Sequence, residues 1–234
     1  MEHSVDSARR FFDGWRSVQK SAVPYRDAAR KAEEAHALTG ANFNIFQALW
    51  PNEIRLSSFI GYLLDPKESH GQGVKYLKLF MSVLDGNAFS LFKPNELELT
   101  KIKLEHTTKK GRRIDLLLEI KCNSQQIIIG IENKPTALET RDQLSDYQNE
   151  LKILQSDYRY MIFLSGIGED SKSADHTHEV KVQQWSYKVH PSKPSLQAWV
   201  RLCAANTSAH SVWNALIAFD EYIAKKFYYN ENPT

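Results

Sequence analysis

The sequence predicts an α/β fold: a mixed central β-sheet that contains an antiparallel meander and is flanked by helices. Hydrophobic residues recur at helical spacing near both ends of the chain, whereas the stretch from about residue 96 to residue 134 alternates with a period of two, as β-strands do. A helical segment then separates this meander from two further strands, an order that is typical of a mixed sheet.

The first part of the chain is expected to be helical. Residues 4–38 read as two helices separated by Pro24, and this segment is most simply a helical cap on the core or, alternatively, an oligomer contact. Asn52 is a plausible N-cap for a helix over residues 52–64, and an amphipathic helix is expected over residues 74–84.

The middle of the chain is expected to form consecutive strands joined by short turns. Residues 96–108 read as a strand or a bulged pair of strands, and residues 109–111 read as the turn that follows. The next strands are RRIDLLLEI at 112–120 and IIIGIENK at 127–134. Pro135 ends the last of these because proline cannot donate to a ladder.

The remaining elements complete one domain. They are a helix over 138–154, strands over 158–165 and 179–187, and helices over 195–205 and 209–227. No repeat or linker interrupts the chain, so we expect a single domain over 1–234. It would consist of a helical extension (1–45), a core (46–190) and C-terminal helices (191–234).

The composition is that of a globular protein, with 42% hydrophobic and 25% charged residues among 234. The net charge of +2 is too small to indicate nucleic acid by itself. No apolar run is long enough to cross a bilayer and the N-terminal stretch lacks the features of a secretory signal, so we expect a cytoplasmic protein without membrane contact. Cys122 and Cys203 form neither a disulfide framework nor a zinc motif.

The second and third strands predict a functional site, because their pairing brings polar side chains together. If a four-residue hairpin loop follows Lys121, that residue pairs with Gln126, and the same antiparallel register places Asp115 directly opposite Glu132. Lys134 lies two residues beyond Glu132 and therefore points to the same face of the sheet.

The opposite face of these strands is wholly apolar and is expected to pack against the core. A slip of one residue would exchange the two faces, so the apolar face supports the register. Its residues are Ile114, Leu116, Leu118, Ile120, Ile127, Ile129 and Ile131.

A third carboxylate is expected beside the pair. If Thr108 pairs with Arg112 around the preceding turn, Glu105 lies on the other flank of Asp115. Carboxylates this close repel unless a proton or cation intervenes, and hard oxygen ligands suit Mg²⁺ or Mn²⁺ rather than zinc. The cluster indicates metal-assisted phosphodiester hydrolysis; the alternative is an exposed sheet face with ordinary salt bridges.

Basic residues surround the meander, and they have two interpretations. They could contact the phosphates of a nucleic acid, or they could protect a solvated strand edge. The cluster consists of Lys101, Lys103, Lys109, Lys110, Arg112 and Arg113, and the last four are the predicted nucleic-acid contacts.

At these residues the sequence resembles the PD-(D/E)XK nuclease superfamily, which has the restriction-endonuclease-like fold. Asp115 matches the isolated acid of the family motif, and Glu132-Asn133-Lys134 matches its E-x-K element. Ile114 stands where the family name has a proline. The resemblance covers roughly residues 45–190. Within the superfamily, the sequence is similar to a bacterial branch of uncharacterised proteins.

The resemblance implies a role for individual residues. Asp115, Glu132, the backbone carbonyl of Asn133 and Glu53 on the early helix would hold Mg²⁺ or Mn²⁺. Lys134 would position or help deprotonate the attacking water and stabilise the charge that develops on the phosphorane.

A further pair extends the implied site. Gln143 and Tyr147 stand four residues apart, hence on one helix face, where they could contact the phosphate or brace Lys134. The implied function is a metal-dependent nuclease acting on nucleic acid, most simply DNA, in defence or repair by analogy.

Two alternatives come from other functional classes. One is a catalytically silent nuclease-fold protein that binds nucleic acid or a partner protein. The other is an interaction module of a homo-oligomer or larger complex, with residues 1–45 as the docking element. The intact trio of Asp115, Glu132 and Lys134 favours the enzyme.

Overall fold

The computed structural model describes residues 20–35, 40, 43–84, 96–176 and 179–227. The chain divides into two compact units, residues 1–43 and 44–234, and each is described by itself. The single domain expected over 1–234 stays a prediction. None of the described helices is long and apolar enough to cross a membrane.

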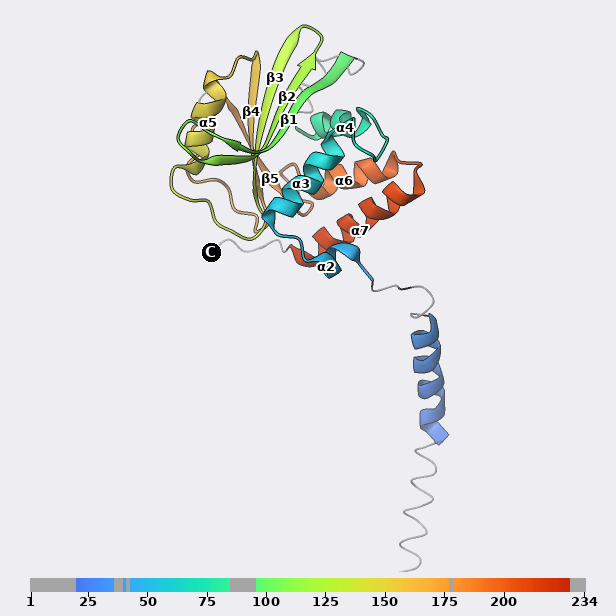
Figure 1. Ribbon diagram of the computed structural model, residues 1–234. Coiled ribbons are helices and arrows are strands. Elements are labelled where there is room, and N and C mark those ends of the chain that lie inside the picture. Colours follow the sequence, from blue (N-terminus) through green and yellow to red (C-terminus); the bar gives the residue numbers. More distant parts are fainter. Residues whose placement is uncertain (1–19, 36–39, 41–42, 85–95, 177–178, 228–234) are drawn as a thin grey trace, which may run out of the picture. The chain divides into compact units, whose positions relative to one another are not determined.

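In the first unit, residues 20–35 are helical on both sides of Pro24 (Figure 1). The expected break at Pro24 is therefore wrong, because a proline removes one hydrogen bond from a helix and can bend it without ending it. The rest of this expected pair of helices, 4–19 and 36–38, lies outside the described residues.

The second unit contains a five-stranded sheet in the order β1-β2-β3-β4-β5. Its strands are β1 (Leu97–Thr107), β2 (Arg113–Cys122), β3 (Gln125–Lys134), β4 (Tyr158–Ser165) and β5 (Lys181–Ser186). β1, β2 and β3 pair antiparallel, whereas β3 pairs parallel with β4 and β4 parallel with β5. The predicted mixed sheet with an antiparallel meander is confirmed.

Six labelled helices surround the sheet. They are α2 (Ile45–Leu49), α3 (Glu53–Leu64), α4 (Lys75–Leu84), α5 (Gln143–Ile153), α6 (Leu196–Ala205) and α7 (His210–Lys226). The expected cap of α3 is confirmed, since the Asn52 side chain accepts a hydrogen bond from the Arg55 N–H at 3.0 Å. The short helix α2 was not predicted, because a single exposed turn has no hydrophobic periodicity.

The start of α5 corrects the expected helix over 138–154. Residues 138–142 are not helical, and the helix begins at Gln143. The reason lies in Glu139, whose carboxylate accepts hydrogen bonds from the backbone N–H groups of Lys172 and Leu144 and from the Ser171 hydroxyl. These bonds tie the segment to a distant loop and keep it out of the helix.

Both faces of the sheet are covered (Figure 1). One face packs its apolar residues, among them Leu116, Leu118 and Ile129, against α3, α4, α6 and α7. The other face packs Leu117 and Ile128 against Leu144, Tyr147 and Leu151 of α5. The alternative of an exposed sheet face is therefore wrong, and polar groups on this face lie in a partly dry environment.

The predicted β2–β3 register is confirmed, with Lys121 opposite Gln126 and Leu116 opposite Ile131. The loop is shorter than expected, because Cys122 also pairs with Gln125 and leaves a two-residue turn. Shortening a hairpin loop by one residue on each side does not change the register of the strands. The expected approach of Asp115 to Glu132 is therefore unaffected by this error.

One apolar residue lies on the face opposite to the one predicted. Ile114 packs with Leu117 on the α5 side rather than with Leu116 on the other. On the neighbouring strand, Glu105 has a left-handed backbone (φ 49°) between two regular pairs, His106 with Ile114 and Leu104 with Leu116. This left-handed residue lies next to the position where the strict alternation that the prediction assumed is broken.

The end of β3 is fixed by a close backbone approach. The Gly166 N–H donates to the Lys134 carbonyl at 2.8 Å, directly before Pro135 ends the strand. A Cβ atom on Gly166 would lie 2.0 Å from the Pro135 carbonyl oxygen, a distance that no side chain can have. Only glycine allows β4 to end beside Lys134.

We expect Gly166→Ala to lower the free energy of unfolding by about 3 kcal/mol or more, because the clash is with backbone and cannot be relieved by a rotamer change. Gly111→Ala is the matched control: its φ of +78° is strained for alanine, but nothing lies within 4 Å, so the expected loss is roughly 1 kcal/mol. Urea denaturation followed by circular dichroism measures both. Equal losses would contradict the proposed close approach.

Candidate active site

A cleft of about 490 Å³ opens where the start of α3, the start of β2, the end of β3 and the start of α5 meet. Its lining combines acidic, basic and amide side chains. The residues are Asn52, Glu53, Ile54, Glu105, Gly111, Arg112, Arg113, Asp115, Glu132, Lys134, Gln143 and Tyr147. Most of the residues predicted from the sequence therefore lie in one cavity.

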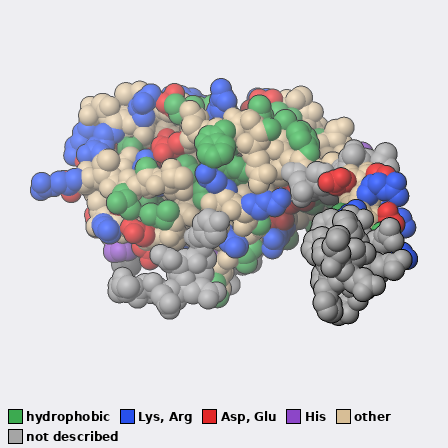
Figure 2. Space-filling view, turned by 90° about the horizontal axis from the view of Figure 1, so that it is seen from below, with side chains coloured by type: hydrophobic (Ala, Val, Ile, Leu, Met, Phe, Trp, Pro, Cys, Tyr) green, Lys and Arg blue, Asp and Glu red, His purple; other side chains and the backbone are tan. Residues whose placement is uncertain are grey.

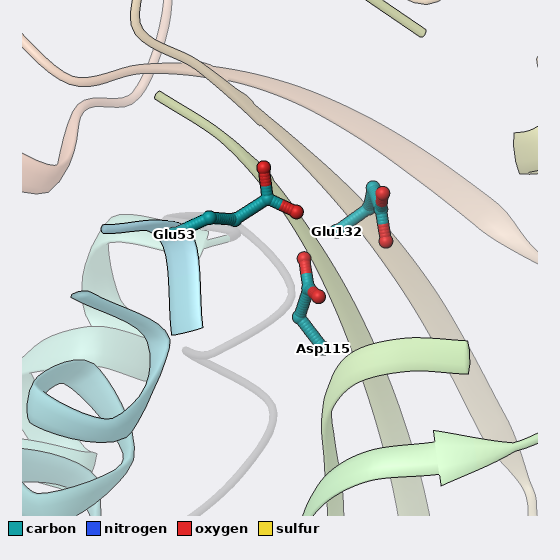
Figure 3. A group of neighbouring side chains, drawn as sticks. All are labelled: Glu53, Asp115 and Glu132. Atoms are coloured by element: carbon teal, nitrogen blue, oxygen red, sulfur yellow. The ribbon is translucent and has the colours of Figure 1, made fainter. Parts of the chain in front are cut away.

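Three carboxylates converge in this cleft. Glu53, Asp115 and Glu132 each present one oxygen, and these oxygens lie within 4.8 Å of one another (Figure 3). Glu53 reaches the sheet from the first turn of α3, where the helix dipole favours a negative charge. The implied role of Glu53 as an additional acid is thus compatible with its position.

Glu105 does not complete this cluster. It lines the same cleft, but its carboxylate accepts a hydrogen bond from the Arg113 guanidinium at 2.7 Å. The pairs on either side, Leu104 with Leu116 and His106 with Ile114, confirm the predicted register beside Asp115, although the Glu105 backbone is left-handed. The third acid of the cluster therefore comes from a helix distant in sequence, and the role of Glu105 as a metal ligand stays a prediction.

Asp115 and Glu132 converge by a different contact from the one expected. The described β2–β3 pairing ends with Leu116 and Ile131, one residue before Asp115 and Glu132. Instead, the Asp115 carboxylate accepts a hydrogen bond from the Asn133 backbone N–H at 2.7 Å. The Asp115 carboxylate thus takes the place of the β2 carbonyl that would otherwise accept from this N–H. It is held where β2 and β3 stop pairing.

Asn133 fixes the end of β3 against the other face of the sheet. Its side-chain amide donates to the Ser57 hydroxyl of α3 at 2.9 Å, and its side-chain oxygen accepts from the Tyr187 hydroxyl at 2.5 Å. Ser57 lies one helical turn after Glu53, so this contact also sets the position of Glu53. Sequence analysis missed Ser57 and Tyr187, and only the spacing of Ser57 from Glu53 could have indicated one of them.

Lys134 lies between two of the acids. Its ammonium is 2.6 Å from Glu132 Oε1 and 3.2 Å from Glu53 Oε1. Burial by itself would lower the pKa of Lys134, but the charge and hydrogen bond of Glu132 and the charge of Glu53 outweigh it and raise that pKa above its usual range. Lys134 is therefore a cation in this site.

Gln143 and Tyr147 brace Glu132 rather than Lys134. The Gln143 amide nitrogen donates to Glu132 Oε1 at 2.6 Å, and its oxygen accepts from the Thr140 N–H at 3.1 Å, which fixes the orientation of the amide. The Tyr147 hydroxyl lies 2.9 Å from the Gln143 amide nitrogen and donates to the Arg113 carbonyl at 2.6 Å. Their implied contact with a phosphate stays a prediction.

Burial and mutual repulsion oppose ionisation of the acids. The pKa of Glu132 is raised to about 8 by burial and by the charge of Asp115. The pKa of Asp115 is raised to about 6 by burial and by the charge of Glu53, although the Asn133 N–H partly offsets this. The site therefore resists carrying the negative charge of all its acids at once, even with the Lys134 ammonium beside them.

The donor set fits a divalent cation. Glu132 is 1% exposed, and its Oε2 is buried without a hydrogen-bond donor among the described residues. An orphaned carboxylate oxygen of this kind is costly unless something positive approaches it. Three hard oxygens from Glu53, Asp115 and Glu132 suit Mg²⁺ or Mn²⁺.

The predicted nucleic-acid contacts are mostly paired within the protein. Arg112 lies 2.9 Å from Asp146, Lys110 contacts the same carboxylate, and Arg113 pairs with Glu105. Lys109 is exposed and forms no ion pair with the described part of the chain. Arg112 and Arg113 line the cleft, so their predicted contact with substrate remains geometrically open.

We expect Asp115→Asn to stabilise the metal-free protein relative to the parent as the pH rises from about 4 to about 7. The folded-state pKa of Asp115 lies above its ordinary 3.8, so the stability that this group contributes is present at low pH and is lost as the pH rises through about 6. This difference in pKa corresponds to roughly 3 kcal/mol. Asparagine cannot ionise, yet its oxygen can still accept from the Asn133 N–H.

Thermal melts in EDTA at several pH values measure this difference. Addition of Mg²⁺ at pH 8 should raise the melting temperature of the parent and leave that of the variant almost unchanged. A variant that is less stable than the parent at every pH would contradict the repulsive cluster.

The family comparison agrees with this geometry. The family model of the PD-(D/E)XK nuclease superfamily matches residues 43–222, which include every residue of the acidic cluster, Lys134 and α5. Neither the curated proteins nor the solved structures that were compared contain a match to the chain. Because the family match spans most of its length, the chain belongs to the PD-(D/E)XK nuclease superfamily.

Proposed function

We propose that this protein is a metal-dependent nuclease that hydrolyses phosphodiester bonds of DNA. The observation that carries the proposal is the convergence of Glu53, Asp115 and Glu132 around a buried lysine ammonium, in a cleft open to solvent. Buried acids that serve only structure normally have both oxygens hydrogen-bonded, whereas Glu132 Oε2 has no donor among the residues that the structure describes.

Glu53, Asp115 and Glu132 would hold Mg²⁺ or Mn²⁺, with the Asn133 carbonyl as a further ligand. When bound, the metal would polarise the phosphate and lower the pKa of an attacking water. The protein supplies the rigid frame: Asn133 fixes Asp115 through its backbone N–H, and Gln143 fixes Glu132 through its amide.

Lys134 acts as a positive charge and hydrogen-bond donor in this proposal. Its raised pKa argues against a neutral amine that would take a proton from water. A cation beside the acidic cluster would instead orient the water and stabilise the negative charge that develops on the phosphate. Of the two roles toward the attacking water that the sequence left open for Lys134, this proposal therefore favours positioning over deprotonation.

The catalytically silent alternative predicts a degraded site, because residues without a catalytic role have no reason to keep this arrangement. The described site instead holds both motif acids, the motif lysine and an additional acid in contact distance of one another. A setting in defence or repair follows from analogy alone.

We expect Asp115→Asn and Lys134→Ala to reduce metal-dependent cutting of plasmid and single-stranded DNA at least about 100-fold, because each removes a charge that acts on the transition state. Gel assays with Mg²⁺, Mn²⁺ or EDTA measure the rate, and circular dichroism establishes that the variants fold. Lys121→Ala, at the far end of β2, is the control and should cut like the parent. Full activity of either site variant would refute the nuclease proposal for this cleft.

We expect Gln143→Ala to raise the Mg²⁺ concentration needed for half-maximal activity by roughly 10- to 100-fold, because Glu132 loses the donor that holds its carboxylate. High Mg²⁺ should restore most of the rate, which separates a positioning role from direct catalysis. Gln126→Ala, exposed at the start of β3, is the matched control. A rate loss that Mg²⁺ cannot restore would contradict the bracing role.

A further inference from the structure

Trp50 is exposed in a backbone conformation that proteins rarely give to tryptophan. It is 76% exposed and has φ 46° and ψ 62°, in the left-handed region. It precedes Pro51, which restricts its backbone further. Exposing a large aromatic ring and holding it in a strained conformation both cost free energy, and strain of this kind is concentrated at functional positions.

The platform that carries Trp50 is firmly attached to the protein. The Asn44 side chain caps α2 and also donates to the Ala218 carbonyl of α7 at 2.7 Å. Phe46 packs against Phe59 and Phe219, with ring centroids 5.0 and 4.9 Å apart. α2 therefore faces the core with Phe46 and presents Trp50 to solvent.

A basic pocket lies directly beside this ring. It has a volume of about 280 Å³ and is lined by Gln47, Trp50, Tyr222, Lys225 and Lys226. The Lys226 ammonium lies 4.6 Å from the centroid of the Trp50 ring. On the face of the molecule that carries α2, basic side chains border hydrophobic ones (Figure 2). An aromatic surface next to two ammonium groups suits a planar base joined to a phosphate.

This pocket is separate from the cleft of the candidate active site, but the two are lined by neighbouring segments of the chain. Trp50 stands three residues before Glu53, so their α-carbons are at most about 11 Å apart. Asn52 and Ile54, on either side of Glu53, also line the active-site cleft. Because a single strand advances roughly 3.4 Å per nucleotide, a strand in the cleft could reach Trp50 within a few nucleotides.

We propose that Trp50, Lys225 and Lys226 form a subsite for an unpaired nucleotide of the substrate strand. The base stacks on the Trp50 ring, and the adjoining phosphate contacts Lys225 and Lys226. The ring is accessible to a base only where the strand is not in a regular duplex, so the subsite selects single-stranded or splayed ends. This inference rests on the proposed function, because it assigns a feature to the substrate of the active-site cleft.

Binding without cutting tests the subsite. The probe is a fluorescein-labelled single-stranded oligonucleotide of roughly 20 deoxynucleotides, compared with its duplex, in EDTA and followed by fluorescence anisotropy. We expect the parent to prefer the single strand and Trp50→Ala to weaken its binding roughly 5- to 100-fold. Trp50→Phe should retain most of the affinity, because a phenyl ring still stacks.

The basic residues have a separate readout. Replacing Lys225 and Lys226 together by alanine should weaken binding and reduce the slope of its salt dependence by about 0.7 for each phosphate that the protein no longer neutralises. Trp213→Ala is the matched control: Trp213 is also exposed on α7, but 13 residues before Lys226, roughly 20 Å along the helix. Its binding should equal that of the parent.

The outcomes separate this inference from the proposed function. If both Trp50 variants and the lysine variant bind the single strand like the parent, the subsite is refuted, even if the protein cuts DNA. If Trp50→Ala instead converts a dimer to a monomer in sedimentation without changing oligonucleotide binding, the ring belongs to a self-contact and the inference also fails. Trp50-dependent binding without Mg²⁺-dependent cutting would refute the nuclease and support the subsite.

Discussion

The alternation of side chains at the end of β3 is the constraint on which the site depends. Glu132 and Lys134 line the cleft, whereas Asn133 between them contacts Ser57 and Tyr187. The same short segment therefore supplies an acid, a cation and an anchor. Its backbone also holds Asp115, through the Asn133 N–H. Any displacement of this segment would move all the charged groups of the site together.

The acids are held close despite their repulsion because the surrounding structure fixes each of them independently. Asp115 is held by a backbone N–H, Glu132 by Gln143 and Lys134, and Glu53 by the first turn of α3. The rise in the pKa values of Asp115 and Glu132 reflects their burial first and the charge of the neighbouring acids second. Such preorganisation favours cation binding, since the unfavourable work of assembling the ligands is done during folding.

The sequence was sufficient for the register of the meander, because hydrophobic residues on alternate positions make any slip expensive. Lys121 pairs with Gln126 as expected, although the loop between them is shorter than assumed. The same logic failed at Ile114, which packs on the α5 face of the sheet and not on the face that alternation predicted. Glu105 lies between the expected pairs beside Asp115, but its carboxylate accepts from Arg113, a contact that spacing along the strands does not predict.

The sequence by itself determined the local features: the strands, the cap of α3, and the pairing that brings Asp115 toward Glu132 and Lys134. These depend on neighbours along the chain or across one hairpin, whose distances the backbone geometry fixes. The family resemblance suggested Glu53, but only the tertiary structure decided that its carboxylate reaches the cluster, that Gln143 holds Glu132, and that Trp50 stands beside the basic end of α7. Those contacts join elements packed from distant parts of the chain, and no periodicity in the sequence encodes their approach.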